Sequence, residues 1–462
     1  MSRSRACPPA TSHGRPSTIV LVLACLGAFM AFLDATIVNI AFPDIRRAFA
    51  AADLSELSWV LNAYNVAFAA LLVPAGRYAE LIGIRRAFSY GVAIFTLASL
   101  GAGLAPSLAA LIAMRVVQAV GAALIVPSSL TLLLRACSMR RRSTAVGLWG
   151  AAAAVAAAIG PSLGGAVVYA ADWRWVFIIN LPIGLITLRL AGSLPDQRSE
   201  RAMRPDALGT ALVATAVGLL ALAIVQGEAW GWQSAAVIGS FLASALSTWA
   251  FIWRTRGRAN PAVDLALFRR VRFRIANLCT AICAMAFYAM LFANALFLTE
   301  VWGYSVWWAG LALTPAPLLA AAVAGPAGRV ADTRGHRIVI AVGGTIYTAA
   351  GILLLVRVGT SPAYLSAFLP ATVLIGIGLG MAFPTLSAAA VSDLSDKSFA
   401  AGSAINAAAR QVGAVVGIAV VATVVGTAGR TSSLAGFRVV WAFTSAAAAL
   451  AAAVILLCWP RP

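Results

Sequence analysis

Long runs of apolar residues alternate with short polar segments along the whole chain. An α-helix needs about 20 mostly apolar residues to cross the hydrocarbon core of a bilayer. Fourteen runs meet this requirement, with approximate bounds 18–42, 57–77, 86–105, 107–134, 143–170, 174–194, 206–226, 234–253, 273–299, 305–328, 338–357, 363–391, 399–427 and 437–459. The connections between them are too short to fold as separate domains. The pattern therefore predicts an all-α polytopic membrane protein.

The composition agrees with this class and excludes others. Hydrophobic residues make up 61% of the chain and charged residues 11%, whereas about a quarter of the residues of soluble domains are charged. Disordered, collagen-like and disulfide-scaffold proteins need polar tracts, a Gly-X-Y period or dense cysteine. The sequence has none of these features.

Basic residues are distributed asymmetrically between the predicted loops. If the N-terminus is cytoplasmic, about three quarters of the 34 Lys and Arg residues fall in cytoplasmic segments, as the positive-inside rule requires. With an even number of spans, both termini are then expected in the cytoplasm. A basic protein can also bind nucleic acid, but here the arginines lie in short clusters between apolar runs. We therefore expect no nucleic-acid partner.

A charged motif occurs twice, once after span 2 and once after span 10. Each copy has a glycine, an acid four positions later, a second glycine after three more, and an arginine after two more. The copies are Gly76, Glu80, Gly83 and Arg85, and Gly328, Asp332, Gly335 and Arg337. Spans 1–6 then correspond to spans 9–14, and spans 7 and 8 are an inserted pair. Two six-helix halves of this kind are typical of transporters that work by alternating access.

The residue types of this repeat suit a conformational latch at the cytoplasmic face. The first glycine permits close helix approach, and the second turns the chain. The acid pairs with basic neighbours or faces a helix N-terminus. An ordinary charged turn is the alternative interpretation, but it should not recur in register in both halves. The predicted organisation is a tail at 1–17, bundles at 18–194 and 273–462, and a linker with two inserted helices at 195–272.

Three ionisable residues lie well within predicted spans: Asp34, Arg115 and Arg410. Such groups cost about 2.5–3.5 kcal/mol at the bilayer centre on insertion scales. Asp34 lies nine residues from Pro43, and Arg115 lies nine residues from Pro106. Both are therefore roughly 13 Å below the outer boundary and can form a pair.

Asp34 is the candidate proton carrier. Burial favours its neutral form and Arg115 favours its charged form, so a carboxylate balanced between them can gain and lose a proton. The alternative is a static pair that only positions two helices. Arg410 has no intramembrane acid in its own half. We expect it to bind helix carbonyls, with contact to a substrate acceptor as the alternative.

Several segments, in order along the chain, carry a resemblance to a known family. Together with the repeated motif they resemble the fourteen-span drug:proton antiporter branch of the major facilitator superfamily. The segments are 33–41 around Asp34, 115–123 beginning at Arg115, 160–165, 173–184 and 406–413. Glu80 in place of the usual Asp, and Leu81 where a basic residue is common, depart from the pattern and concern the strength of the latch.

The resemblance implies the major facilitator fold, with two six-helix bundles plus two inserted helices. It implies a role for Arg115 in proton transfer. It also implies that an antiporter motif acts as a hinge or seal against proton leak, and its residues are Gly160, Pro161, Gly164 and Gly165. Polar residues that are candidates for the substrate cavity, or else for interhelical contacts, are Asn62, Tyr64, Asn65 and Asn294, together with Arg410.

The function expected from these features is export of hydrophobic compounds, with cations as one charge class, in exchange for protons. Export of an endogenous metabolite, siderophore or lipid-like molecule is the alternative, and proton-coupled import comes after it. A membrane-embedded enzyme is disfavoured because the sequence has no HExxH or zinc cluster, and a channel because no charged pore element repeats. We expect no cofactor and no metal, only a proton gradient.

The expected partners are a small-molecule substrate, protons and the lipid bilayer, and we expect a monomer. The Arg- and Ala-rich composition is typical of a GC-rich bacterial genome. The expected location is therefore the bacterial inner (plasma) membrane.

Overall fold

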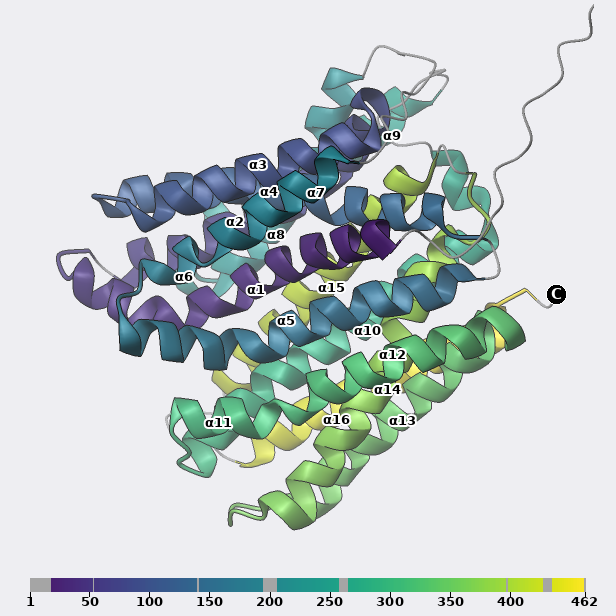
Figure 1. Cartoon of the computed structure of the whole chain (residues 1–462). Coiled ribbons are helices and arrows are strands. Elements are labelled where there is room, and N and C mark those ends of the chain that lie inside the picture. Colours follow the sequence, from purple (N-terminus) through teal and green to yellow (C-terminus); the bar gives the residue numbers. More distant parts are fainter. Residues whose placement is uncertain are drawn as a thin grey trace, which may run out of the picture.

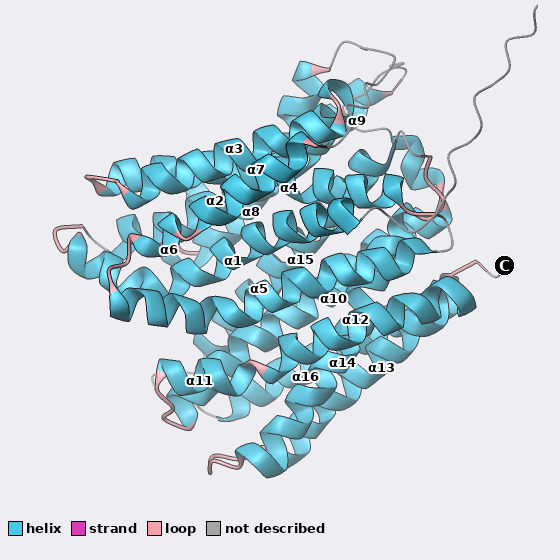
Figure 2. Cartoon of the chain, in the orientation of Figure 1, coloured by secondary structure: helices cyan, strands magenta, loops and turns pink. Residues whose placement is uncertain are grey.

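The computed structural model describes residues 18–52, 54–138, 141–193, 206–256, 265–395, 398–426 and 434–460. All the regular secondary structure in these segments is helical (Figure 2). The predicted tail at 1–17 and the linker residues 194–205 lie outside the described part of the chain.

The helices of the N-terminal half correspond to the first six predicted spans, because each is an apolar run bounded by polar or glycine-containing turns. They are α1 (Thr18–Ala48), α2 (Leu54–Ile82), α3 (Ile84–Gly103), α4 (Leu108–Ala136), α5 (Arg142–Ala170), and the consecutive α6 (Trp175–Ile178) and α7 (Asn180–Gly192). Within this half, α4 packs against α2 and α3, and α1 packs against α5.

The C-terminal half repeats this arrangement. Its helices are α10 (Val271–Leu296), α11 (Val306–Leu313), α12 (Pro315–Arg334), α13 (His336–Arg357), α14 (Leu369–Val391), α15 (Phe399–Gly426) and α16 (Leu434–Cys458). A 3₁₀ turn, η2 (Leu265–Arg269), precedes α10, and π-helical turns η3 (Phe297–Val301) and η4 (Tyr364–Phe368) flank α10 and α14. One predicted span is divided into α11 and α12 at Pro315, which lacks a backbone N–H and suits the first position of a helix.

Thirteen helical segments of the described chain are long and apolar enough to cross a membrane. Helix α3 occupies the remaining predicted span. It has 20 residues and packs along α4, so it is a full-length member of the bundle although it is less apolar than the others.

The two halves contact each other through equivalent helices. Helix α5 of the N-terminal half packs against α12 and α14, and α15 of the C-terminal half packs against α2 and α4. Figure 1 shows the halves as two bundles with α5 and α15 between them. The contact of α5 with α12 corresponds to that of α15 with α2, and the contact of α5 with α14 corresponds to that of α15 with α4. A pseudo-twofold axis requires this relation.

The halves are joined mainly at one end of the molecule. We call this the basic end; it is where α1 begins at Thr18 and α16 ends at Cys458 (Figure 1). A single apolar cluster there includes Leu134 and Trp149 from one half and Phe399 from the other. At the opposite end each half has its own apolar cluster. The described packing is therefore an arrangement closed at the basic end.

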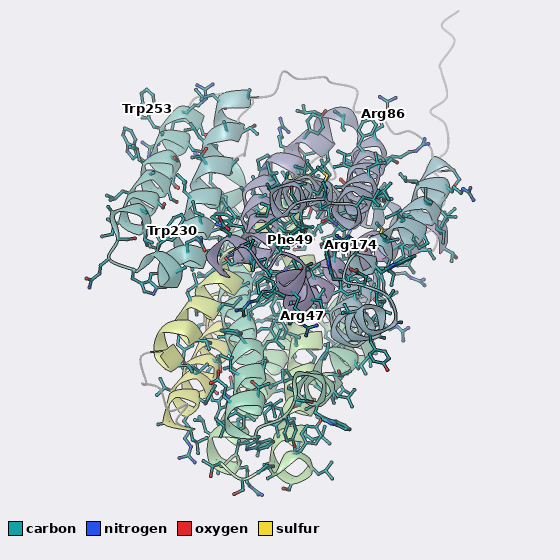
Figure 3. All side chains as sticks on the ribbon, turned by 90° about the vertical axis from the view of Figure 1, so that its left-hand side faces the viewer. Arg47, Phe49, Arg86, Arg174, Trp230 and Trp253 are labelled. Atoms are coloured by element: carbon teal, nitrogen blue, oxygen red, sulfur yellow. The ribbon has the colours of Figure 1, made fainter. Side chains whose placement is uncertain are left out.

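The inserted helices α8 (Ala207–Trp230) and α9 (Ala235–Thr255) form a hairpin beside the two bundles. Helix α8 packs against α2 and α15, so it covers the seam between the halves on one side. Helix α9 packs against α8 and exposes large apolar side chains, including Leu242, Trp249 and Trp253. Figure 3 shows Trp253 on the outer side of this hairpin. Such a face suits contact with lipid.

We predict that residues 135–142 and 254–272 are cytoplasmic and residues 226–233 external, because the basic clusters identify the inner face. Single cysteines at Arg141 and Gln233, in a background without the six native cysteines, test this orientation. A membrane-impermeant maleimide should label the cysteine at 233 in intact cells and the cysteine at 141 only after permeabilisation. Labelling of position 141 in intact cells would reverse the orientation.

Candidate functional site

Asp34 on α1 and Arg115 on α4 form an ion pair in the middle of the N-terminal half. Arg115 Nη1 lies 2.5 Å from Asp34 Oδ2. The exposed fractions are 0% for Asp34 and 1% for Arg115. The pair that their equal depth predicts is therefore present, and neither side chain reaches solvent in this arrangement.

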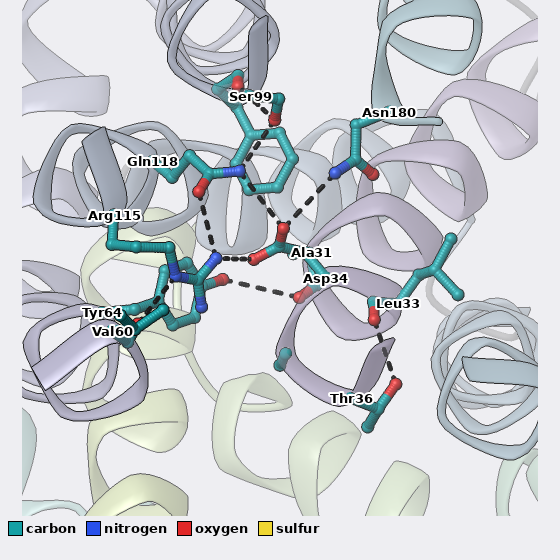
Figure 4. Close-up of polar contacts among 12 residues, drawn as sticks. Ala31, Leu33, Asp34, Thr36, Val60, Tyr64, Ser99, Arg115, Gln118 and Asn180 are labelled. Carbon is teal, nitrogen blue, oxygen red and sulfur yellow. Dashed lines mark hydrogen bonds and ion pairs between the residues drawn. The ribbon is translucent and has the colours of Figure 1, made fainter. Parts of the chain in front are cut away.

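Two amide side chains complete the surroundings of the carboxylate. Gln118 Nε2 donates to Asp34 Oδ1 at 3.2 Å, and Asn180 Nδ2 donates to the same oxygen at 3.3 Å (Figure 4). Gln118 also orients the cation, because its Oε1 accepts from Arg115 Nη1 at 3.0 Å. Asp34 thus accepts hydrogen bonds from three side chains on two helices, Arg115 and Gln118 on α4 and Asn180 on α7.

The guanidinium is fixed from its other side. Arg115 Nε donates to the carbonyl of Val60 on α2 at 3.0 Å. The ring of Tyr64, one helical turn further along α2, lies 4.2 Å from Arg115 Cζ, within the range of cation–π attraction. Phe177 on α6 lies on another side at 5.8 Å. The guanidinium of Arg115 therefore contacts a carboxylate, a backbone carbonyl and two aromatic rings.

The network extends to α3 through Ser99. Gln118 Nε2 donates to Ser99 Oγ at 2.8 Å, and Ser99 donates to its own helix at Phe95 O. Sequence reasoning placed Asp34 and Arg115 here but missed Gln118, Asn180 and Ser99. Gln118 could have been found, since it lies three residues after Arg115 on the same helix face. Asn180 lies in the 173–184 segment, but its direction toward Asp34 depends on how α7 packs.

A buried pair of this kind can act as a two-state element. Removing one partner of a buried ion pair leaves the other charge uncompensated, at a cost of about 3–5 kcal/mol. Protonation of Asp34 has this consequence for Arg115, so a proton change at one atom is able to displace the whole network. The static role remains the alternative, and only a variant that changes the charge can separate the two.

The 160–165 segment lies beside this site. A Cβ atom at Gly160 on α5 would lie 2.1 Å from Thr36 Oγ1 on α1, two residues from Asp34. Only glycine therefore permits α5 to approach α1 at this point. Gly164 is buried and Gly165 half-buried, and the side chain of Pro161 lies outside the described part of the chain.

The acids of the repeated motif bind helix N-termini across the interface between the halves. Asp332 on α12 accepts from the backbone amides of Ser143 and Thr144, both at 2.9 Å, and from Thr144 Oγ1 at 2.6 Å. These groups form the first turn of α5. The carboxylate therefore caps the positive end of a helix of the other half.

Glu80 on α2 has the equivalent position at the N-terminus of α15. Its Oε1 accepts from the backbone amide of Ala401 at 3.0 Å, and its Oε2 binds Arg77 at 2.8 Å. The sequence predicts that each acid pairs with a basic neighbour or faces a helix N-terminus. Glu80 does both, whereas Asp332 faces a helix N-terminus. The usual Asp and the observed Glu can both reach such a terminus, since the longer side chain requires only a different rotamer.

The arginines of the motif bind C-termini within their own halves. Arg85 donates to the carbonyls of Ala191 and Gly192 at the end of α7, at 3.1 and 2.9 Å. Arg337 donates to the carbonyl of Leu456 near the end of α16. A cation at a helix C-terminus is favourable. The arginines of the two copies therefore make equivalent contacts.

The glycines of the motif have two separate roles. Gly83 and Gly335 have φ of 98° and 87° and join α2 to α3 and α12 to α13, a conformation that favours glycine. A Cβ atom at Gly76 would lie 2.4 Å from Ala404 Cβ, and one at Gly328 would lie 2.5 Å from the carbonyl of Ser143. The first glycine of each copy therefore allows the close crossing of α2 with α15 and of α12 with α5.

The candidate cavity residues are dispersed. Asn62 donates to Gln226 Oε1 on α8 at 3.4 Å, and Asn294 accepts from Trp441 Nε1 on α16 at 2.9 Å. Tyr64 belongs to the Asp34 network, and Asn65 is half-buried on α2. Arg410 on α15 lies against the ring of Phe32 on α1, in the other half.

Replacing Gly76 by Leu should impair transport while the protein still inserts, because the side chain separates α2 from α15 at the basic end. The matched control is Gly239→Leu on α9, where a Cβ atom meets nothing within 4 Å. Efflux in inverted vesicles, normalised to the inserted protein, measures both. Wild-type efflux by Gly76→Leu would contradict a mechanical role for the repeat.

Asp332→Ala should weaken closure of the basic end by about 0.5–2 kcal/mol, the usual effect of losing an N-cap. Asp332→Asn should stay close to wild type, because its amide oxygen still accepts from the α5 amides. The readout is the rate at which an impermeant maleimide labels a single cysteine at Ser403, a buried position on α15. Equal acceleration in both variants would show that the charge, and not the cap, closes this end.

Comparison with known proteins identifies the family. The family model described as Major Facilitator Superfamily matches residues 24–418. Multidrug resistance protein Stp of Mycobacterium tuberculosis (strain CDC 1551 / Oshkosh) is 34% identical over 414 residues, which cover 89% of this chain and 76% of Stp. Cephamycin export protein CmcT of Amycolatopsis lactamdurans is 34% identical over 92% of this chain and 89% of CmcT. Methylenomycin A resistance protein of Bacillus subtilis (strain 168) is 31% identical over 95% of this chain and 93% of its own.

Solved structures agree in fold. The human organic anion transporter MFSD10 (TETRAN) superposes with a TM-score of 0.69 at 15% identity, over 96% of this chain and 100% of that chain. The proton:xylose symporter XylE superposes with a TM-score of 0.67 at 14% identity, over 96% of each chain. With the family model matching most of its length, and with relatives at 31–34% identity over nearly all of it, the chain belongs to the Major Facilitator Superfamily.

Proposed function

We propose that the protein exports hydrophobic, drug-like compounds in exchange for protons, as a single chain in the cytoplasmic membrane with its basic end inside. The observation that carries this proposal is the Asp34–Arg115 network. It places one titratable carboxylate, fully buried, between the helices of a transporter fold. A group that changes charge in such a position can couple a proton to a conformational change.

The names of the relatives support export over import. Stp is a multidrug resistance protein, CmcT is a cephamycin export protein, and two other relatives are methylenomycin A and puromycin resistance proteins. Resistance by a membrane transporter requires movement of the compound out of the cell. A second candidate function is export of a metabolite that the host cell itself makes. The relative that exports cephamycin favours this candidate.

The mechanism follows from the two sets of contacts. With the basic end inside, the caps at Asp332 and Glu80 close the cytoplasmic side, so the described arrangement belongs to the stage that releases substrate outward. Here Asp34 is an anion held by Arg115, Gln118 and Asn180. When the helices around Asp34 loosen and admit water from outside, a proton neutralises Asp34 and frees Arg115. The strain on the network then favours the other arrangement, in which the caps open and the proton leaves to the cytoplasm.

Asp34→Asn should abolish proton-driven export, since the amide keeps the shape of the side chain but cannot titrate. Inverted vesicles with an acidic lumen, tested with a panel of drug-like compounds, should accumulate no more compound than vesicles without the protein. Asp34→Glu should retain part of the activity. The control Asp172→Asn removes a half-exposed carboxylate at the opposite end from the basic end and should transport normally.

The static-pair alternative gives a different result. If Asp34 only neutralises Arg115, removing both charges in Asp34→Asn/Arg115→Leu should restore uphill export. Rescue by the double variant, or uphill export by Asp34→Asn alone, would refute the proton-carrier role.

A further inference from the structure

Arg410 is a cation at the interface between the halves. It lies on α15, within the membrane-spanning region, and is half-buried. Among the described residues it forms neither an ion pair nor a hydrogen bond; it lies against the ring of Phe32, whose centroid is 5.6 Å from Cζ, and interacts electrostatically with Tyr288. The other intramembrane arginine, Arg115, donates to a carboxylate, a backbone carbonyl and an amide oxygen. An unsatisfied guanidinium at this depth is costly, so an anion that reaches it gains a strong partner.

A small cavity beside Arg410 has two chemically different walls. Its volume is about 10 Å³, the room for one water molecule. The wall from α4 and α5 is apolar and includes Leu130 and Trp149, whereas the wall from α14 and α15 is polar and includes Ser387, Ser403 and Asn406. No acid lines it. Because the walls belong to different halves, the cavity widens when the halves separate at the basic end.

The apolar side carries rigid aromatic groups next to the cation. The Phe32 ring packs edge-on against Trp149, with centroids 6.4 Å apart. Trp149 is fixed because its Nε1 donates to Ser129 Oγ at 3.1 Å. On the polar side, Asn406 is held by Thr280 and Ser387. The region thus presents two aromatic rings at right angles to each other, a positive charge and fixed hydroxyl and amide groups.

We infer that Arg410 binds the anionic group of the exported compound, and that the substrates are amphipathic aromatic anions or zwitterions. This inference rests on the proposed export function and adds the charge class of its substrate. The aromatic part lies against Phe32 and Trp149, and the carboxylate, sulfonate or phenolate binds the guanidinium. A cationic substrate has no counter-charge here, because Asp34 is occupied by Arg115 and faces away from solvent.

Equilibrium binding tests this with two probes of nearly equal shape. 8-Anilinonaphthalene-1-sulfonate is an aromatic anion, and N-phenyl-1-naphthylamine has the same ring system without the sulfonate. Their fluorescence is titrated against the full chain in phosphatidylcholine nanodiscs, with empty nanodiscs subtracted. The variants are Arg410→Gln, which removes the charge, and Arg410→Lys, which keeps it. Arg438→Gln, at an exposed position on α16, is the matched control.

Arg410→Gln should weaken binding of the sulfonate about tenfold, the effect of one lost charge-assisted hydrogen bond. Arg410→Lys should weaken it less, and Arg438→Gln should leave it unchanged. Binding of the uncharged probe should be the same in all four proteins. Equal effects on both probes, no effect on the sulfonate, or no saturable sulfonate binding by the wild type would overturn the inference.

The wild-type protein provides a second test that needs no folded variant. Phenylglyoxal modifies arginine, and peptide mass spectrometry follows its reaction at Arg410. The sulfonate should slow the modification of Arg410, and the uncharged probe should not. Equal modification rates in the presence of the two probes would overturn the inference.

Failure of the inference can be distinguished from failure of the proposed function. If Asp34-dependent export of the sulfonate proceeds unchanged in Arg410→Gln, the export function stands and the anion site is wrong. If the sulfonate binds through Arg410 but no compound of the panel is exported on a proton gradient, the site stands and the export function is wrong.

Discussion

The Asp34–Arg115 pair must be satisfied entirely by protein groups, because water reaches neither side chain. Five helices supply these groups: α1 and α4 carry the pair, α2 and α7 contribute Val60 O and Asn180, and α3 contributes Ser99 through Gln118. Each contact fixes the position of a helix as well as a charge. The N-terminal bundle is therefore organised around one buried ion pair, and a change in its protonation bears on the whole bundle.

The motif acids close the basic end by binding the partial positive charge of helix N-termini in the opposite half. Asp332 and Glu80 each bind the first turn of a helix in the opposite half. Such caps contribute about 0.5–2 kcal/mol each, which is small enough to be broken in every transport cycle. The glycines at 76 and 328 allow the helix crossings that bring each acid to its partner. Weak, matched contacts of this kind suit a gate that opens and closes repeatedly.

The two intramembrane cations differ in a way that separates coupling from recognition. Arg115 is enclosed in one half by a carboxylate, a carbonyl and aromatic rings. Arg410 lies between the halves against the ring of Phe32 and forms no ion pair with a described residue. Phe32 and Asp34 are two residues apart on α1. In the mechanism that we propose, an occupant at Arg410 and a proton at Asp34 therefore act on the same helix turn.

The sequence by itself determined the membrane class, the helical spans, the internal repeat and the depth of Asp34 and Arg115. Each of these depends on position along a helix axis, which hydrophobic run length and the rise per residue specify. Tertiary structure alone decided which side chains meet. It placed Gln118 and Asn180 on Asp34, gave the motif acids backbone amides of the other half as partners, and turned Asn62 and Asn294 toward neighbouring helices. The reason is that helices apolar on nearly all sides carry little information about their rotation, and close packing of small residues fixes that rotation instead.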